Sequence, residues 1–548
     1  MNLIVSFFFI FGVFSVSNYL DKKYYKENNV IISVFIFTKI IGILYFFLIC
    51  LFILNLNTKP FCIFILILCS LLGFYNFLSL IEIKKIKLFL EKQNYLFYII
   101  ILILFLFLLS AMLPPADIDS LRYHLEIPKK IINDKFYEYI TLDYTYFGAI
   151  EFINLFGLNF NFENTSSLLN FSYLLFLVIS NIYIFEKFKV GSNNIGNLIV
   201  LTSPYLLSMI STQKIYFLPC FSIIYSFAYL ILNQYKIKFK VHQLISSILI
   251  FSIAIKVVFS FFVLVIFLFQ AYLLRKDFRK IFYLVLTYSF FVFSFLFPLF
   301  FLKLKIFGNP FVPFLDFYNV NANWLDEFKF FLLQYENPLN IYNLLLFPIK
   351  LILPLSFDIL NNLNDKDIIY FDYANIFKLI GLGVIGIFFL KNKNNKIYIF
   401  LFLLILSFLF IGNLQNRWFF PLLIFISIFY NTSNSFHKYF KNAIMLQSLF
   451  TIIVLFVLSG ISIKAKFFDK ESVLNTMAYG YKFSKKIEKE YPDTKIVTFI
   501  ENYYYLENYL PLFKHNLLIK YDNKYFFNNL KKKQKFILIY PKELNVEE

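Results

Sequence analysis

Cysteine, histidine and glycine are scarce in this chain: 548 residues include four cysteines, four histidines and 14 glycines. All four cysteines fall inside apolar segments, at Cys50, Cys62, Cys69 and Cys220. They form no Cys-x-x-Cys pair, no metal-ligand spacing and no disulfide framework. The sequence therefore predicts no disulfide scaffold, no metal and no cofactor, and it disfavours chemistry based on a cysteine nucleophile.

Charge is also scarce, at 16% of residues, whereas 60% are hydrophobic, 22% are aromatic and the mean hydropathy is +0.69. A soluble globular chain is nearer 45–50% apolar, so this composition predicts an integral membrane protein. A formal net charge of +19 could suit nucleic acid. The lysines, however, stand in short runs between apolar segments, which is the arrangement that sets topology in a bilayer. We expect no nucleic-acid partner.

Apolar runs recur at lengths that suit crossing a bilayer, which needs about 20 residues per helix. The run 244–274 is too long for one helix and carries Lys256 near its middle, so we divide it into two crossings with Lys256 at the bend. The N-terminal run lacks a basic segment and a cleavage site, and we treat it as a retained span. About fourteen spans result, at 1–19, 30–55, 60–81, 95–113, 165–185, 195–210, 216–233, the divided 244–274, 281–302, 375–391, 397–411, 417–431 and 442–463.

Basic loop residues test this topology, because cytoplasmic loops are enriched in lysine and arginine. With 244–274 divided, the cluster Arg275 to Lys280 joins the other lysine runs on one side. Both termini, the loop 114–163, the loop 303–374 and Arg417 then lie on the opposite, extracytoplasmic side. All the candidate chemistry is expected on that face.

The densest group of polar residues follows the uncharged run 95–113. Charges held against a membrane cost energy and tend to mark function. We predict that Asp119 caps a short helix beginning at Ser120, and that Pro128 ends this helix or begins another. The group consists of Asp117, Asp119, Arg122, Tyr123, His124 and Glu126.

The second outer loop and the C-terminal tail contain fewer residues that point to a function. Residues 307–314 are rich in turn formers, and Ile341 to Leu355 reads as a helix lying at the membrane interface. From Lys464 the chain becomes water-soluble, with a helix expected at 471–490 and strands at 495–500 and 535–540. The sequence therefore predicts a transmembrane domain over 1–463 and a small extracytoplasmic α/β domain over 464–548.

Several motifs, in one order along the chain, resemble a known family. Pro114-Pro115 followed by Asp119-Ser-Leu-Arg-Tyr-His-Leu125 is similar to the first-loop motif of bacterial GT-C membrane glycosyltransferases, which include protein O-mannosyltransferases and lipid A aminoarabinose transferases. The resemblance covers about 95–465 and leaves the first three spans unexplained. Where many members have an aromatic-proline stretch, this chain has Phe147-Gly148-Ala149. The later motifs are Glu151, Ala254-Ile-Lys256, Gly308-Asn309-Pro310 with Pro313, and Arg417-Trp-Phe-Phe-Pro421.

The resemblance implies transfer of a sugar from a polyprenyl-phosphate donor to an extracytoplasmic acceptor, with inversion, in the bacterial inner (plasma) membrane. The acceptor would be a lipid, glycan or protein of the cell envelope. An acceptor hydroxyl needs a base, and Asp119 is our first choice, with Asp117 as the second catalytic carboxylate. The leaving phosphate needs cations. The candidate substrate-binding residues are Arg122, Tyr123, His124, Glu151, Lys256 and Arg417.

Other interpretations stay open. Asp119 could serve only as a helix cap, Tyr123 and His124 as interfacial anchors, and Lys256 as a topological charge. The chain could instead be a transporter or flippase of lipid-linked sugars, although such proteins place polar groups near the midplane of repeated halves, and we find no internal repeat. An O-antigen polymerase or ligase, which uses arginine in a large outer loop, and a purely structural membrane protein are further alternatives.

Overall fold

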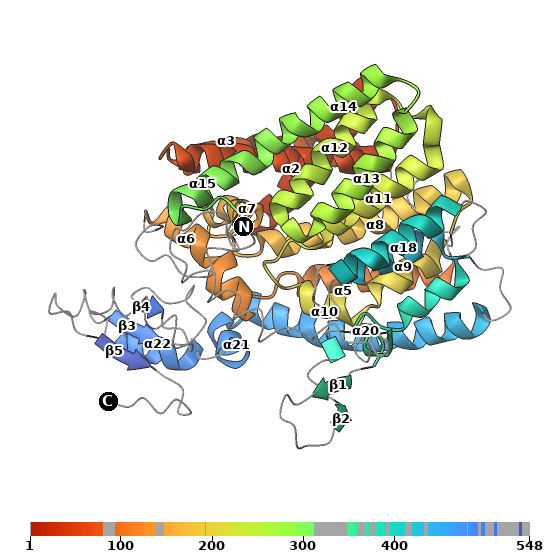
Figure 1. The fold of residues 1–548 in the computed structure, drawn as a ribbon. Helices are drawn as coiled ribbons and strands as arrows, with labels where there is room; N and C mark the ends of the chain where they lie inside the picture. Colours follow the sequence, from red (N-terminus) through yellow and green to blue (C-terminus); the bar gives the residue numbers. More distant parts are fainter. Residues whose placement is uncertain are drawn as a thin grey trace.

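The architecture is predominantly helical. The structure, a computed structural model, describes residues 2–80, 94–134, 136, 147–191, 193–311, 348–353, 355–358, 368–371, 376–377, 379–390, 395–410, 419–431, 437–478, 481–490, 495–498, 509–511 and 536–539. Long helices run side by side and make up the body of the molecule (Figure 1). They are α1 (Asn2–Leu20), α2 (Val30–Ile53), α3 (Thr58–Leu80), α5 (Tyr95–Ser110), α8 (Thr165–Phe188), α11 (Phe217–Asn233), α12 (Phe239–Ile255), α13 (Ser260–Leu274), α14 (Phe278–Phe291), α15 (Phe297–Phe307), α18 (Asn395–Phe410), α19 (Phe420–Phe429) and α20 (His437–Phe467).

Six helical stretches of the described chain are long and apolar enough to cross a membrane. They are Val30–Ile53, Thr58–Tyr75, Thr165–Phe188, Val257–Leu274, Phe278–Phe307 and His437–Phe467. Shorter apolar helices, such as α5 and α11, stand beside them. The chain is therefore a helical, membrane-embedded protein, as predicted. The larger number of about fourteen crossings stays a prediction.

The break at Lys256 is confirmed. Helix α12 ends at Ile255, Lys256 is extended at φ −156° and ψ 108°, and α13 begins at Ser260 after a short 3₁₀ turn. The two helices contact each other, and Gln270 of α13 donates a hydrogen bond of 3.1 Å to the carbonyl of His242 in α12. The charged residue in a long apolar run thus marks a chain reversal.

Two predicted spans are wrong in detail. The run 195–210 is divided into α9 (Asn193–Leu201) and α10 (Pro204–Met209), because Ser203 before the proline is extended (ψ 125°), as a pre-proline residue prefers. The described residues of 375–391 form a short 3₁₀ helix, η8 (Leu382–Phe389), after Gly381 at φ +93°, and no spanning α-helix. Between the predicted spans, α7 (Ala149–Leu158) was missed, and all its residues are buried.

The basic runs and the loop after α5 lie at opposite ends of the helices. Lys238 pairs with Glu27 at 3.1 Å, and three other lysines stack on aromatic rings at this end, namely Lys240 on Tyr24, Lys396 on Tyr272 and Lys441 on Tyr95. Helices α6 (Glu126–Ile132), α7 and the end of α15 gather at the other end, on the left in Figure 1. This separation agrees with the pattern of basic loops.

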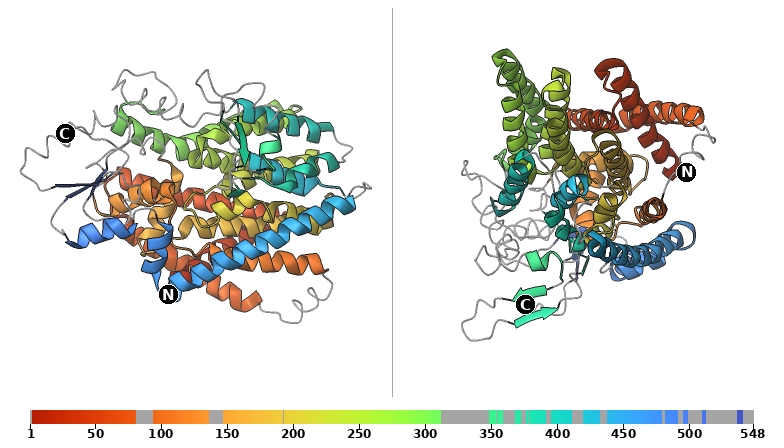
Figure 2. Two further views of the ribbon diagram at one scale, coloured as in Figure 1. Left: turned by 90° about the horizontal axis from the view of Figure 1, so that it is seen from below. Right: turned by 90° about the vertical axis from the view of Figure 1, so that its right-hand side faces the viewer.

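The C-terminal part begins with α20, which runs along one side of the bundle (Figure 2) and packs against α5. The predicted single helix 471–490 is wrong, because the chain leaves the helical conformation at Ala478, between α21 (Lys470–Met477) and α22 (Tyr481–Glu490). Strands β3 (Lys495–Thr498), β4 (Tyr509–Pro511) and β5 (Phe536–Ile539) pair in parallel in the order β4-β3-β5. Much of 464–548 lies outside the described residues, so a separate α/β domain stays a prediction.

A second, antiparallel pair joins β1 (Leu355–Asp358) to β2 (Ile368–Phe371). Leu355, the predicted end of an interfacial helix, therefore belongs to a strand. The first part of that predicted helix, 341–347, lies outside the described residues.

Close packing of α9 against α19 depends on glycine. A Cβ atom on Gly196 would lie 2.3 Å from the carbonyl oxygen of Ser427. Buried hydrogen bonds tie the same helices, because Asn181 of α8 donates to Asn197 Oδ1 at 2.9 Å and to Ser427 Oγ at 3.1 Å. The hydrophobic effect does not drive helices together inside a bilayer. Small residues and interhelical hydrogen bonds stabilise their packing instead.

We therefore expect Gly196→Ala to push α9 from α19 and to destabilise the protein by about 1–3 kcal/mol, the usual cost of overpacking. Gly460→Ala is the matched control, because a Cβ atom at Gly460, also within a helix, meets nothing within 4 Å. Thermal unfolding of the two purified variants in detergent measures the difference. Equal melting temperatures would show that the α9–α19 contact tolerates a methyl group.

Candidate functional site

The loop after α5 folds into a π-helical turn, η2 (Ser120–His124), followed directly by α6. Asp117, and not Asp119, caps this turn, because the Ser120 amide donates to Asp117 Oδ2 at 3.1 Å. The prediction for Asp119 is wrong, since its backbone is already helical (φ −64°, ψ −37°) and its side chain makes no cap hydrogen bond. A capping residue normally has an extended backbone. Pro128 lies in the first turn of α6, so it begins a helix, which was one of the two expectations.

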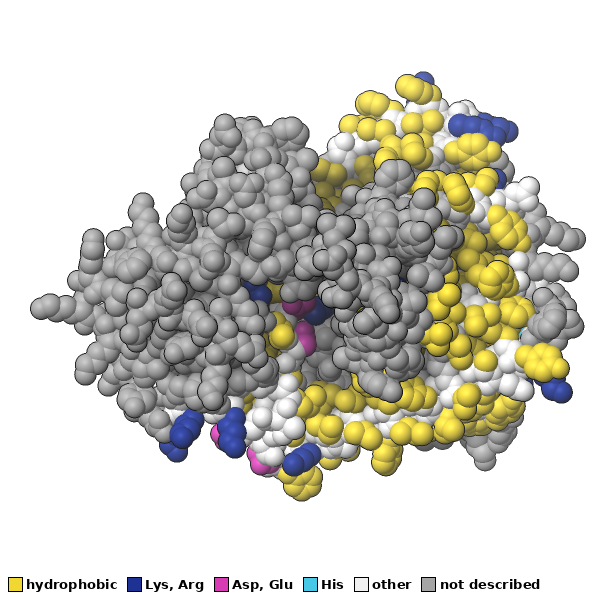
Figure 3. Space-filling view, turned by 60° about the horizontal axis from the view of Figure 1, so that its bottom comes forward, with side chains coloured by type: hydrophobic (Ala, Val, Ile, Leu, Met, Phe, Trp, Pro, Cys, Tyr) yellow, Lys and Arg dark blue, Asp and Glu magenta, His cyan; other side chains and the backbone are white. Residues whose placement is uncertain are grey.

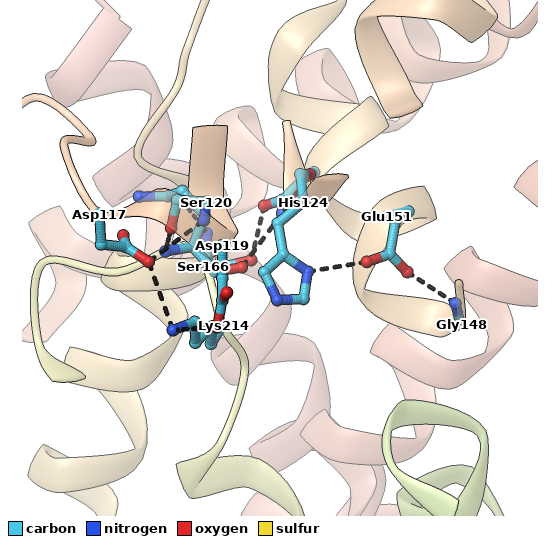
Figure 4. A network of polar contacts seen from close by, with 10 residues as sticks. Asp117, Asp119, Ser120, His124, Gly148, Glu151, Ser166 and Lys214 are labelled. Carbon is cyan, nitrogen blue, oxygen red and sulfur yellow. Dashed lines mark hydrogen bonds and ion pairs between the residues drawn. The ribbon is translucent and has the colours of Figure 1, made fainter. Parts of the chain in front are cut away.

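Lys214 joins the two aspartates. Its Nζ lies 2.7 Å from Asp119 Oδ2 and 3.3 Å from Asp117 Oδ2 (Figure 4). The side chains of Lys214, Asp117 and Asp119 are 21%, 28% and 40% exposed, so a solute can reach this ion cluster. Figure 3 shows acidic and basic side chains close together near the middle of the view, with hydrophobic side chains over much of the described surface to their right. Lys214 was not among the predicted site residues, although it is a lone lysine between two apolar runs on the predicted outer side.

The turn that carries Lys214 is fixed by side chains from the neighbouring helices. The Gln213 amide donates to Ser120 Oγ at 2.8 Å, which joins this turn to η2. Asn170 of α8 donates to the Lys214 carbonyl at 2.7 Å and accepts from the Tyr216 amide at 3.2 Å. The backbone around Lys214 is therefore held in place.

A buried pair lies beside the ion cluster. His124 Nδ1 is 2.7 Å from Glu151 Oε1, and the Gly148 amide donates to Glu151 Oε2 at 2.7 Å (Figure 4). A carboxylate only accepts hydrogen bonds, so Nδ1 carries the hydrogen when Glu151 is ionised. Glu151 is 1% exposed. Its predicted contact with substrate stays a prediction; in the structure it orients His124.

The remaining candidates from the first loop lie on η2. The Tyr123 ring is 4.2 Å from the His124 ring, between centroids, and is half-buried, as is Arg122. Asn154 of α7 donates to the His124 carbonyl at 3.0 Å and to the Gln213 carbonyl at 3.3 Å. One buried amide thus ties η2 to the turn that carries Lys214.

Lys256 reaches the same region from the α12–α13 bend. Its Nζ lies 5.3 Å from the centroid of the Tyr216 ring, two residues after Lys214. A Cβ atom on Gly148 would be 3.0 Å from the Ala254 carbonyl, so the bend also packs against the residue that binds Glu151. Four separate segments, around Asp119, Glu151, Lys214 and Lys256, therefore converge at one end of the bundle.

The later motifs are only partly described. Gly308 ends α15 at φ +70°, and the Phe311 amide donates to Asn309 Oδ1 at 2.9 Å, so Gly308-Asn309-Pro310 is a turn, as predicted. Lys303 of α15 is buried. Arg417 and Pro313 lie outside the described residues.

No group of three or more metal-ligating His, Cys, Asp or Glu side chains occurs in the described part of the chain. No protein-family model, curated protein or solved structure matches the sequence. The residues and their geometry are therefore the basis for any assignment of function.

Proposed function

We propose that the chain is a membrane glycosyltransferase of the GT-C kind, which moves a sugar from a polyprenyl-phosphate donor to an acceptor hydroxyl with inversion. The observation that carries this proposal is the partly exposed cluster of Asp117, Asp119 and Lys214 at one end of the bundle. Sugar transfer from a phosphate needs a carboxylate near the acceptor hydroxyl and a cation near the leaving phosphate. This cluster supplies both within one ion-paired group.

Asp119 is the better base of the two aspartates. Asp117 Oδ2 caps η2, and Asp117 Oδ1 is buried without a hydrogen-bond partner in the described residues. Asp119 is the more exposed carboxylate and holds no cap. In the proposed reaction Asp119 removes the acceptor proton while Lys214 and Lys256 face the phosphate. Arg122, Tyr123 and His124, on the turn after Asp119, would contact the sugar or phosphate.

An apolar groove of about 540 Å³ supports the lipid-linked donor. It lies among α12, α13, α14 and α15, and its lining includes Ile253 and Ser260, which flank the Lys256 bend. A polyprenyl chain in this groove would place its phosphate beside Lys256, where charge complementarity favours it. Other lining residues are Val263, Phe267, Val292, Phe297 and Phe300.

We place the proposed enzyme in a bacterial inner membrane. With the basic runs in the cytoplasm, the cluster and both termini face outward across a bacterial inner membrane. The acceptor is then a lipid, glycan or protein of the cell envelope, and the residues 464–548 would form a soluble extracytoplasmic domain.

The test is sugar transfer by the purified full-length protein in liposomes. A panel of polyprenyl-phosphate hexoses and pentoses with radiolabelled sugars serves as donor, and extracted native membrane lipids serve as acceptor. The expected result is labelled acceptor together with an equal amount of free polyprenyl phosphate. Movement of intact donor between leaflets without sugar transfer would instead support a flippase and overturn the proposal.

A further inference from the structure

The ion pair between Lys214 and Asp119 sets a chemical problem for catalysis. A lysine 2.7 Å from a carboxylate stabilises its negative charge, and so weakens it as a base. The same lysine is one of the cations available to the leaving phosphate. One side chain therefore faces two anions that are needed at different moments of the reaction.

We propose that Lys214 is an exchangeable cation that couples donor binding to activation of the base. Before the donor arrives, Lys214 is paired with Asp119 and Asp117. When the donor phosphate enters, Lys214 turns to the phosphate and releases the Asp119 carboxylate. This inference rests on the proposed transferase function and adds a regulatory step to it.

Three features of the site allow such an exchange. The backbone of Lys214 is fixed by Asn170, so a change of partner needs only side-chain rotation. The three charged side chains are partly exposed, so the pair does not have to separate in a fully desolvated interior. A lysine has three rotatable donors on a flexible stem, which suits a point charge that changes partners better than the planar fork of arginine does.

The proposed sugar transfer conserves atoms and charge. Asp119 takes the proton of the acceptor hydroxyl, and the acceptor oxygen forms a bond to the anomeric carbon. The bond from that carbon to the phosphate oxygen breaks, and its electron pair stays on the phosphate. The polyprenyl phosphate leaves with one more negative charge than the donor phosphate had, and Lys214 faces that charge.

Direct binding of a polyprenyl monophosphate, without any sugar, tests the exchange. The probe is farnesyl phosphate, titrated calorimetrically into the full-length protein in detergent. Lys214→Met should raise the Kd about 10–100-fold, as expected for loss of a hydrogen bond to a charged group. Asp119→Asn should lower the Kd about 3–10-fold, because it removes the anion that competes for Lys214. In Lys214→Met/Asp119→Asn, the gain should vanish, and the Kd should match that of Lys214→Met.

The opposite effects of Lys214→Met and Asp119→Asn on the Kd distinguish this role from a merely structural one. If Lys214 only held Asp119 in place, Asp119→Asn would leave phosphate binding unchanged or weaken it, and this result would overturn the inference. Lys214→Arg keeps the charge and should bind the probe within about threefold of wild type. If Lys214→Arg loses binding as Lys214→Met does, the loss comes from altered packing and the inference fails.

A second ion pair of similar exposure provides the control. Asp277 and Lys280, at the other end of α13 from Lys256, lie 3.1 Å apart, and the Asp277 side chain is 42% exposed against 40% for Asp119. Asp277→Asn and Lys280→Met should leave the Kd unchanged. Equal effects at both pairs would show that the probe responds only to net charge, which contradicts the inference.

These results also distinguish the inference from the proposed function. Sugar transfer by the wild type, without coupling between Lys214 and Asp119 in the binding cycle, would overturn the inference and leave the transferase. Coupling in the binding cycle without transfer from any donor would overturn the transferase and leave a phosphate-binding cation exchanged against Asp119.

Discussion

Asp119→Asn should lower the rate of sugar transfer by more than about a hundredfold, the contribution of a positioned general base. The amide has the size of the carboxylate and keeps a hydrogen-bonding oxygen, but it does not take up a proton at neutral pH. Because Asp119 does not cap η2, the substitution should leave the turn folded. The measurement is kcat for transfer at saturating donor, with thermal unfolding of the same preparation to establish that it folds.

Asp277→Asn is the matched control for this loss. Asp277 is also a partly exposed aspartate paired with a lysine, and the hydrogen bond from Lys280 holds the pKa of its carboxyl below the usual value. It caps α14 by accepting from the Lys280 amide at 3.2 Å, and asparagine caps equally well. We expect unchanged kcat. If Asp119→Asn retains transfer while Asp117→Asn loses it a hundredfold, Asp117 is the base and the assignment is wrong.

Hydropathy predicted the helices well because a membrane-spanning helix depends on the residues of its own segment. A bilayer demands a continuous apolar run, and α2, α8 and α20 satisfy that demand within their own sequences. The chain reversal at Lys256 was predictable for the same reason, since one charge inside a long apolar run is costly unless the chain turns there. The break before Pro204 was also visible in principle, because proline restricts the residue before it.

The contacts between the site residues could not be predicted from local sequence. The local sequence around Lys214 shows a lone lysine but not its partners, because Asp117 and Asp119 come from about a hundred residues earlier in the chain. The sequence prediction assigned the cap to Asp119. The helical backbone at Asp119, which depends on tertiary packing, leaves that role to Asp117. Helix α7 was missed because ten residues are too few for a span, yet its burial places Glu151 against His124.

Glu151→Ala should destabilise the protein by about 3–5 kcal/mol, the cost of removing one partner from a buried pair. The carboxylate is 1% exposed and accepts from both the His124 ring and the Gly148 amide. Its loss leaves two buried donors without an acceptor. Thermal unfolding in detergent measures the effect, and sugar transfer should fall with it, because His124 closes the turn after Asp119.

The control is Glu163→Ala. Glu163 forms an ion pair of 2.8 Å with Lys470, whose side chain is 47% exposed. Partly exposed pairs of this kind contribute about 0–1 kcal/mol. Similar destabilisation by the two substitutions would mean that Glu151 contributes only a general charge and does not fix His124.

Glu151→Gln separates folding from chemistry at this pair. A glutamine oxygen still accepts from the Gly148 amide, and its NH₂ group donates to His124 Nδ1, so stability should stay within about 1 kcal/mol of wild type. That donation forces the imidazole hydrogen onto Nε2, the opposite tautomer from the one that an ionised Glu151 imposes. If His124 accepts a hydrogen bond from the sugar or acceptor through Nε2, transfer should fall about tenfold or more in a stable protein. Unchanged transfer would show that His124 is a packing residue, and that the function of the first loop depends on Asp119 and Lys214.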